Sequence, residues 1–170
     1  SVMAQDYEQL EVLVVDDCTP DQSISIVEKM INAYEGPHTY RIIRHVKNGG
    51  LSAARNSGLH EALGELIYFL DSDDYICERA ISSLVEIYNQ TQASIVVGNL
   101  KIVDHQTGEM VRNSIQLPLS YYFFDSLRDL YACREIVEMD LNGIAWNKLI
   151  EKNFLLENNL FFDIGMLFED

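Results

Sequence analysis

Short runs of apolar residues alternate with longer amphipathic stretches through residues 1–100, a pattern that predicts alternating strands and helices. Residues 66–70 form an unbroken apolar and aromatic run, and residues 11–15 are a second strand candidate, in which four apolar residues follow Glu11. Runs of this length are typical of strands that are buried on both faces, as in a parallel sheet. Residues 40–45 and 95–98 are two further strand candidates. The pattern therefore predicts an α/β domain.

The stretches between these strands carry apolar side chains at helical spacing. The first helix is expected to begin at Pro20, which suits the first helical position, and to end at Gly36-Pro37. Ser52 is expected to cap a second helix that ends at Gly64, and a third helix is expected over residues 78–89. Because a helix separates successive strands, the strands are expected to pair in parallel through right-handed crossovers.

The pattern changes beyond the fourth strand candidate. Residues 101–111 favour a hairpin with its turn at Thr107-Gly108, residues 120–131 favour a helix, and residues 152–157 favour a shorter one. No internal repeat, low-complexity tract or linker divides the chain, so we expect one domain over residues 1–170.

The composition is ordinary for a globular protein, but the charge is strongly acidic. The 27 Asp and Glu residues outnumber the 12 Lys and Arg residues and give a formal net charge of −15. This balance argues against nucleic acid as a partner, because Lys and Arg must neutralise its phosphates, and against simple adsorption to anionic lipid. No apolar run approaches the ~20 residues of a membrane span, and no signal peptide is visible.

The cysteines and histidines indicate no metal site. The three cysteines, Cys18, Cys77 and Cys133, are widely spaced and fit a reduced cytoplasmic setting best. The four histidines show no ligand spacing and are expected at the surface. We therefore expect a cytoplasmic protein.

Carboxylates gather where two predicted strands end. They are Asp16 and Asp17 after residues 11–15, and Asp71, Asp73 and Asp74 after residues 66–70. In open α/β sheets, ligands bind outside the carboxyl ends of the strands. Clustered carboxylates repel one another and resist burial, so they need a cation or water. The pattern favours a divalent metal bound to a phosphorylated ligand, and the alternative is a solvated acidic turn.

Five motifs occur in a fixed order along the chain. They are Val14-Val15-Asp16-Asp17, the NGGLSAARNSG segment at 48–58, the FLDSDD segment at 69–74, Trp146-Asn147-Lys148-Leu149, and Phe168-Glu169-Asp170. This succession resembles glycosyltransferase family 2, the inverting nucleotide-sugar transferases with a GT-A fold. The acid triplet alone would be a weak indication, and the order of all five motifs carries the resemblance.

The resemblance implies a Rossmann-like mixed sheet flanked by helices. Residues 1–100 would form the nucleotide-binding half and residues 101–170 the acceptor-side half. The implied reaction moves a sugar from a nucleoside diphosphate sugar, with UDP-sugar favoured, to a saccharide or lipid-linked acceptor. Such a reaction fits cell-surface polysaccharide synthesis, with the parent protein peripheral at the inner membrane face.

A divalent metal site in the acid loop is implied in the same way. Asp71-Ser72-Asp73 matches the family's Asp-x-Asp motif, which implies that Asp73 contacts Mn²⁺ or Mg²⁺ directly. Asp71 would lie nearer the ribose or a metal-bound water. Such a cation acts as a Lewis acid on the leaving diphosphate and is held by one or two carboxylates plus substrate phosphates. The alternative is that these acids cap the helix after Glu78.

Two other segments are implied to bind the nucleotide. Asp17, with its neighbour Asp16, is placed to accept hydrogen bonds from the base or the ribose, although Asp17 could instead cap the helix after it. Arg55 could pair with the diphosphate, or it could pair with Asp71 and hold two loops together.

The remaining residues are implied to face the sugar and the acceptor. Asp170 is the candidate general base, because an inverting displacement needs a base on the face opposite the leaving group. Glu169 belongs to the same acidic pair, and Asp74 is placed toward the sugar. Trp146 could stack on a sugar ring, although a lone Trp more often belongs to the core.

Two departures from the family pattern suggest an internal fragment of a longer transferase. The family's usual first strand, a central one, and its Pro-x-Tyr-Asn-like loop are missing before Tyr7, and the chain stops at Asp170, where the family continues. A missing central strand would leave two unpaired strand edges, which favour pairing with another chain. We therefore expect a swapped or sheet-extended dimer, and the fragment itself could be inactive.

Two other functions are compatible with parts of the sequence. A phosphorelay receiver domain also begins with a strand, an acid pair and a helix, and Asp71 would then be the phosphoacceptor. A receiver needs a Lys at the end of a later strand, which residues 95–98 do not supply, and it leaves Asp73 and the glycine-rich segment unexplained. The third possibility is a non-catalytic module that binds a nucleotide sugar.

Overall fold

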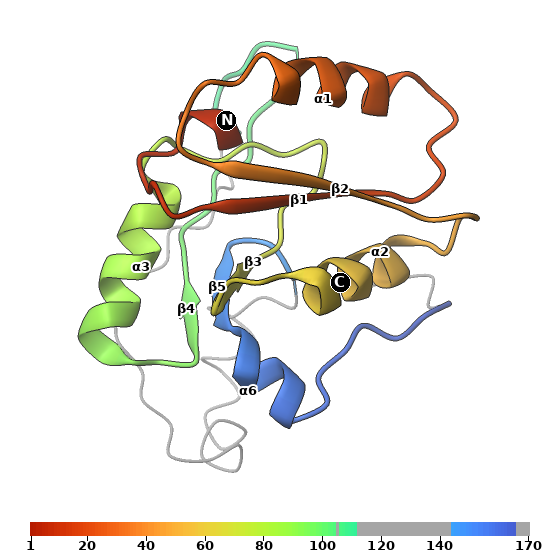
Figure 1. Ribbon diagram of the computed structural model, residues 1–170. Coiled ribbons are helices and arrows are strands. Elements are labelled where there is room, and N and C mark those ends of the chain that lie inside the picture. The colour runs from red at the N-terminus through yellow and green to blue at the C-terminus, as the bar shows by residue number, and fades with distance from the viewer. Residues whose placement is uncertain (105, 112–143, 166–170) are drawn as a thin grey trace.

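The computed structural model describes residues 1–104, 106–111 and 144–165 (Figure 1). Strands and helices alternate as far as the fourth strand, which confirms the predicted α/β arrangement. In chain order the elements are η1 (Val2–Ala4), β1 (Glu11–Asp16), α1 (Ser23–Asn32), β2 (Thr39–Arg44), α2 (Leu51–Glu61), β3 (Leu66–Tyr68), α3 (Ala80–Thr91), β4 (Ile95–Val97), β5 (Lys148–Glu151) and α6 (Lys152–Glu157). Among the helices in these ranges, none combines the length and hydropathy that a membrane crossing requires.

The first two strands form a parallel pair, as predicted. Their register places Glu11 opposite Thr39 and Asp16 opposite Arg44, so both strands end at the same edge. Helices α1 and α2 lie on opposite sides of this pair (Figure 1). The turn that leads from β2 into α2 therefore starts at the same edge as the acids that follow β1.

The second sheet differs from the predicted parallel pairing. Its order is β3-β5-β4, and β5 runs antiparallel to both neighbours, with Ile150 opposite Ile67 and Ile95. The sequence pattern predicts no strand over residues 148–151, because only two adjacent apolar residues stand there between charged ones. The strand forms because it pairs on both sides, and it buries Leu149 to 3% exposure and Ile150 to 8%.

Within the described residues, no strand pairing joins the two sheets. β1 pairs only with β2 and β3 only with β5 in this part of the chain, so each strand has an edge without a ladder partner there. Edges of this kind are the feature on which the expected dimer depends, and the dimer itself stays a prediction.

Two buried clusters attach the helices to the sheets. The first joins α3 to β4 and β5 through Ile81, Leu84, Val85, Val96 and Leu149. The second joins α2 to β3 through Leu59, Ala62 and Ile67, with α6 residues Leu155 and Leu156 packed against it. α2 also lies against β1, because a Cβ at Gly58 would stand 3.6 Å from the Val15 side chain. α2 therefore connects the two sheets, and it is the helix that follows the glycine-rich turn.

Two helices begin at residues other than those predicted. α1 begins at Ser23 and not at Pro20, because Asp21 Oδ1 accepts a hydrogen bond from the Ser23 N–H at 2.8 Å and holds the preceding residues in a turn. Gly50, with a φ of 86°, is the N-cap of α2, so Ser52 lies buried inside the helix.

The other boundaries are close to those predicted. β3 ends at Tyr68, and Phe69 continues it as an isolated parallel bridge to Trp146. An isolated antiparallel bridge confirms the hairpin predicted over residues 101–111. The helix predicted over residues 120–131 lies outside the described residues.

Candidate active site

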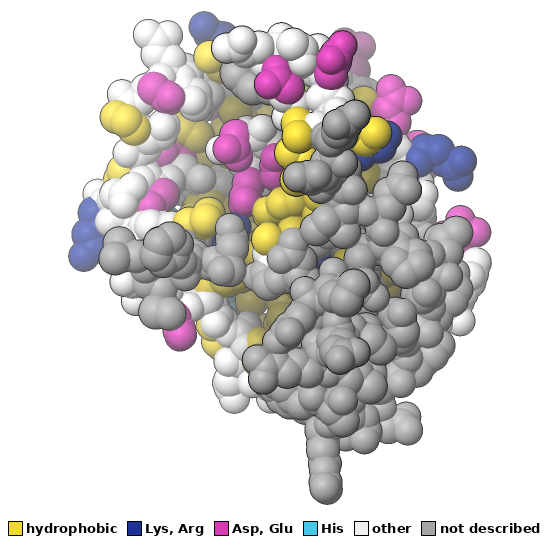
Figure 2. All heavy atoms as spheres, turned by 180° about the vertical axis from the view of Figure 1, so that it is seen from behind, with side chains coloured by type: hydrophobic (Ala, Val, Ile, Leu, Met, Phe, Trp, Pro, Cys, Tyr) yellow, Lys and Arg dark blue, Asp and Glu magenta, His cyan; other side chains and the backbone are white. Residues whose placement is uncertain are grey.

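The acids that follow β1 and β3 both contact the start of α2. Asp17 binds the glycine turn at the N-terminus of this helix, and Asp71 binds Arg55 in its second turn. Gly50 and Arg55 are about 7 Å apart along the axis, at 1.5 Å per residue. The two carboxylates therefore lie near the same end of one helix, as the predicted site requires. Figure 2 shows Asp and Glu side chains gathered over the upper half of one face, with Lys and Arg side chains mostly at its margins.

Asp17 organises the turn between β2 and α2. Its Oδ2 accepts hydrogen bonds from the N–H groups of Gly50 at 2.7 Å and Gly49 at 3.0 Å. Its Oδ1 lies 2.8 Å from the Gly49 nitrogen and 2.6 Å from His45 Nδ1, and its backbone oxygen accepts a hydrogen bond from the Asn48 side chain. Burial opposes ionisation, but the hydrogen bonds from His45 and the glycine N–H groups outweigh it and lower the pKa of Asp17.

These contacts give the glycine-rich motif a physical cause. A Cβ at Gly49 would stand 2.9 Å from the Ala53 Cβ, so the close approach of this turn to α2 needs glycine there. A carboxylate has about four lone-pair positions, and the donors on Asp17 use most of them. The structure does not support the alternative that Asp17 caps α1, because its carboxylate binds the N–H groups of Gly49 and Gly50, and the N-cap of α1 is Gln22. A base contact by Asp17 stays a prediction.

Arg55 and Asp71 form an ion pair in which the Arg55 side chain is buried and that of Asp71 is partly exposed. Arg55 Nη2 donates to Asp71 Oδ1 at 3.0 Å, and the Arg55 side chain is 4% exposed. The pair joins α2 to the loop after β3, as the sequence allowed. A guanidinium buried to this extent needs a negative partner nearby, so the pair fixes the position of the Asp71 carboxylate.

The rest of the acid loop is open to solvent. The Asp74 N–H donates to the Asp71 carbonyl at 3.1 Å and closes a turn that exposes Asp73 and Asp74. Partial desolvation of the Asp74 carboxyl group, and then repulsion from Asp73 and Asp71, raise the pKa of Asp74. The Asp74 carboxylate therefore lies close enough to Asp71 and Asp73 for their charges to repel its own, and a cation beside the loop would relieve that repulsion.

The donor set fits a cation that is completed by a ligand. In the described part of the chain, no group of three or more His, Cys, Asp or Glu side chains is arranged to hold a metal ion by itself. Mn²⁺ and Mg²⁺ sites of transferases need only one or two carboxylates, with phosphates supplying further oxygens. Asp73, which is exposed, and Asp71, whose carboxylate is held by Arg55, would supply these two carboxylates.

Trp146 lies beside the strand that carries the acid loop. It forms a bridge with Phe69, two residues before Asp71. The next residue, Asn147, has a φ of 64° and is 5% exposed, and its side chain donates to the Gly98 carbonyl at 3.1 Å. The Gly98 N–H in turn donates to the Asn147 carbonyl at 2.7 Å. These contacts place Trp146 near the predicted site, whereas Glu169 and Asp170 lie outside the described residues.

Two further residues at this site carry no signal in the sequence pattern. His45 was expected at the surface, but its side chain is 18% exposed and its Nε2 lies 2.8 Å from Ser57 Oγ. Phe162, in the segment after α6, packs against Arg55 and Phe69. The expectation of surface histidines is also wrong for His38, which is 6% exposed. No local pattern could reveal these positions, because every partner is distant in sequence.

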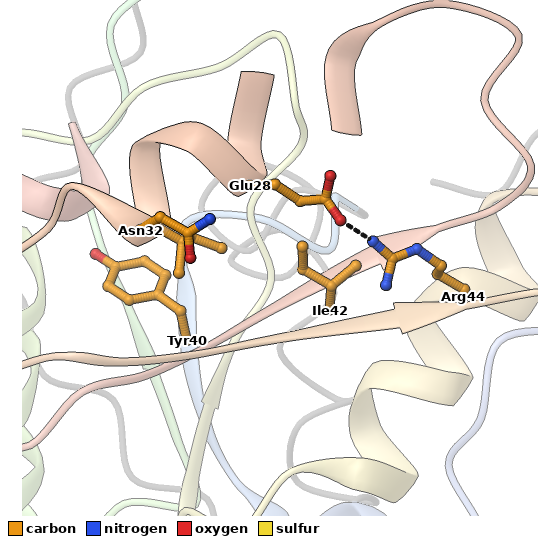
Figure 3. Close-up of a pocket in the computed structure, with 6 residues that line it drawn as sticks. Glu28, Asn32, Tyr40, Ile42 and Arg44 are labelled. Carbon is orange, nitrogen blue, oxygen red and sulfur yellow. Dashed lines mark hydrogen bonds and ion pairs between the residues drawn. The ribbon is translucent and has the colours of Figure 1, made fainter. Parts of the chain in front are cut away.

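A separate pocket of about 480 Å³ lies between α1 and β2 (Figure 3). Its lining residues are Glu28, Ile31, Asn32, Tyr40, Ile42 and Arg44. Glu28 and Arg44 form an ion pair at its rim at 2.5 Å, and burial with the neighbouring Tyr34 raises the pKa of Tyr40 to about 12. Because α1 lies on the side of β1 and β2 opposite α2, this pocket is distinct from the acid-bearing loops.

Comparison with known proteins decides the family. The sequence model for glycosyl transferase family 2 matches residues 1–149. The chain belongs to this family. The match covers four of the five motifs, and it does not favour the receiver-domain alternative.

Curated relatives align along the whole of this family 2 chain. Glycosyltransferase GlyA from Streptococcus pneumoniae is 34% identical over 175 residues, which cover 100% of this chain and 24% of the relative. Cholesterol galactosyltransferase from Borreliella burgdorferi is 31% identical over 176 residues, which cover 98% of this chain and 46% of the relative. The chain therefore spans less than half the length of each.

A solved structure shows the fold of this family 2 chain. The mannosyltransferase PcManGT from Pyrobaculum calidifontis, in complex with GDP-Man and Mn²⁺, matches with a TM-score of 0.63 at 20% identity. The match covers 95% of this chain and 41% of the mannosyltransferase. The predicted GT-A fold is confirmed, with its mixed strands flanked by helices.

Proposed function

We propose that the protein transfers a sugar from a nucleoside diphosphate sugar to a saccharide or lipid-linked acceptor, with inversion and with a divalent metal. The observation that carries this proposal is the convergence at the start of α2, where Asp17 holds the glycine turn and Arg55 holds Asp71. Membership of glycosyl transferase family 2 supports the reaction class.

The donor that we propose is a UDP-sugar. The mannosyltransferase whose fold this chain shares was solved with GDP-Man and Mn²⁺, so a GDP-sugar is the competing donor that an assay must include. A role in cell-surface polysaccharide synthesis, at the cytoplasmic face of the membrane, completes the proposal. This chain spans less than half of its curated relatives GlyA and cholesterol galactosyltransferase, so the proposal concerns the whole protein.

The acid loop and α2 would bind the donor. Asp73 and Asp71 would hold Mn²⁺ or Mg²⁺, which when bound supplies a Lewis acid for the diphosphate oxygens. Arg55 keeps the Asp71 carboxylate in place and adds positive charge beside the diphosphate. Asp17, with Asp16, would face the base and ribose, and the glycine turn would keep side chains out of that space.

The remaining residues would serve the acceptor. Trp146, bridged to Phe69, would offer its ring to a sugar, and Asp74 would contact a sugar hydroxyl. Partial desolvation of its carboxyl group, and then repulsion from Asp73 and Asp71, raise the pKa of Asp74. Asp170 would accept the proton of the acceptor hydroxyl as general base, with Glu169 beside it.

Thermal unfolding with UDP or GDP, each with MnCl₂ or with EDTA, tests the donor site. A ligand at a hundred times its Kd stabilises the folded state by about 2.7 kcal/mol, so a Mn²⁺-dependent rise in Tm is expected. Asp73→Asn should remove the Mn²⁺-dependent part and leave the Tm without ligand unchanged, because Asp73 is exposed. Glu86→Gln, an exposed charge change on α3, is the matched control.

The outcomes separate the functions that the sequence left open. Mn²⁺-dependent binding of either nucleotide, followed by sugar transfer by the whole protein, is the expected result. Binding without transfer would point to a nucleotide-sugar binding module. A rise that survives Asp73→Asn would contradict the metal role of Asp73.

A further inference from the structure

Phe162 contacts three residues at the candidate site, namely Asn56, Arg55 and Phe69. The segment that carries it follows α6 and is far from α2 in sequence, but the Asn56 side chain binds its backbone on both sides. Asn56 Nδ2 donates to the Phe162 carbonyl at 2.8 Å, and the Phe162 N–H donates to Asn56 Oδ1 at 2.9 Å. This reciprocal pair fixes the position of the Phe162 backbone on α2.

The Phe162 ring contacts the neighbours of Asp71. The Arg55 guanidinium carbon lies 5.1 Å from the ring centroid, over the ring. The Phe69 ring lies at 5.2 Å and 86° from it, an edge-to-face arrangement. Arg55 makes the ion pair with Asp71, and Phe69 precedes Asp71 by two residues on the same segment. One ring therefore touches both the partner of Asp71 and the strand end that carries it.

The contact restricts how Arg55 can present its charge. A ring over one face of a guanidinium attracts it and keeps water from that face, which leaves the planar edge to make hydrogen bonds. In the structure, that edge carries the Asp71 contact at 3.0 Å. Loss of the ring would admit water and free the guanidinium to rotate, and Asp71 would lose its fixed partner.

We propose that Phe162 is a positioning residue for Asp71, acting through Arg55 and held in place by Asn56. The consequence for donor binding rests on the function proposed above. Phe162 belongs to the half of the chain expected to face the acceptor, and it lies seven residues before Glu169. The acceptor-side segment thus sets the geometry of a carboxylate in the donor site.

Phe162→Leu tests the proposal, with Phe161→Leu as the matched control. Phe161 is the adjacent residue and stacks on His60 at 5.2 Å, so its replacement removes an aromatic contact with α2 that does not involve Arg55. The first measurement needs no ligand: NMR signals of the Arg55 guanidinium should be shifted upfield by the ring in the unmodified protein. Phe162→Leu should abolish this shift and speed the exchange of these protons with water, and Phe161→Leu should do neither.

The second measurement is the affinity for UDP and for GDP, with and without MnCl₂. Phe162→Leu should weaken Mn²⁺-dependent binding about tenfold and metal-free binding less, because the metal contact depends on the position of Asp71. A general loss of folding would weaken both equally. Asn56→Ser keeps the Phe162 ring but removes both hydrogen bonds to the Phe162 backbone. It should change the Arg55 NMR signals and the Mn²⁺-dependent affinity in the same direction as Phe162→Leu does, and it replaces Phe162→Leu if that variant does not fold.

The two proposals fail in different ways. If the unmodified protein binds neither nucleotide with Mn²⁺, the donor-site function fails, and the Arg55 signals still decide the positioning role. If Phe162→Leu leaves the Arg55 signals unchanged, or weakens Mn²⁺-dependent binding no more than Phe161→Leu does, the positioning role of Phe162 is overturned.

Discussion

Replacing Asp17 with asparagine should destabilise the protein by about 3 kcal/mol at neutral pH, because hydrogen bonds to charged groups contribute roughly 1.5–3 kcal/mol each. The new side-chain amide would keep one acceptor oxygen and place an NH₂ group where Asp17 Oδ2 now accepts from Gly50 at 2.7 Å. Two donors would then face each other, and the remaining bonds would lose their charge. The Asp17 side chain is only 16% exposed, so solvent screens these interactions weakly.

The same substitution has a defined pH dependence. The pKa of Asp17 is lowered from 3.8 in the folded protein, so its stabilising effect is complete above that value and is lost as the pH falls through the lower folded pKa. The Asp17→Asn protein has no carboxyl group at position 17, so this position does not titrate. The difference in unfolding free energy between the two proteins should therefore be larger at neutral pH than in acid and should shrink below pH 3.8.

Urea unfolding at a series of pH values measures this difference. Asp16→Asn is the matched control, because Asp16 is the adjacent residue and an amide can keep the oxygen that accepts from the Thr19 N–H. We expect its cost to be below about 1 kcal/mol, the size of one neutral hydrogen bond. If Asp17→Asn costs no more than Asp16→Asn, or if its cost is the same at acidic and neutral pH, the organising role of the Asp17 carboxylate is wrong.

The packing and the strand edges lead to three further predictions. Gly49→Ala should cost about 1–3 kcal/mol, because the added Cβ would meet the Ala53 Cβ at 2.9 Å. Urea unfolding beside Gly64→Ala, where the added Cβ would make only an ordinary contact at 3.6 Å, would measure the difference. Leu59→Ala should cost about 2–5 kcal/mol, because the side chain is 1% exposed, and a loss below about 1 kcal/mol in the same assay would contradict the packing described for α2. The unpaired edges of β1 and β3 in the described part of the chain should favour a dimer, and light scattering that shows only monomer across the accessible concentration range would refute this.

The sequence predicts the local elements well, because their causes are local. The apolar runs at 12–15 and 66–70 become β1 and β3, and the helical spacing near residues 78–89 becomes α3. β5 could not be predicted, because Leu149 and Ile150 form a strand only when β3 and β4 pair on either side. Whether a strand lies at the edge or in the centre of a sheet is decided by residues that are distant in sequence, so no short stretch of the sequence reveals it.

The candidate site shows the same division. The order of motifs indicated which residues matter, and the structure brings Asp17, Arg55 and Asp71 to one helix. The sequence left open whether Arg55 pairs with Asp71 or with the diphosphate, and the structure shows the pair with Asp71. His45 and Phe162 could not be predicted, because their contacts form between segments that are neighbours only in the folded protein.

The position of β5 between β3 and β4 has a consequence for synthesis of the chain on the ribosome. The central strand of the second sheet is the last of the three to emerge, so β3 and β4 must wait for residues 148–151 before they acquire their shared partner. Sheets closed by such late, long-range contacts form slowly and leave unsatisfied strands exposed in the nascent polypeptide. A ribosome that stalls before Lys148 would therefore hold an unfinished sheet, and this stage of translation is where chaperone assistance would have its greatest effect on yield.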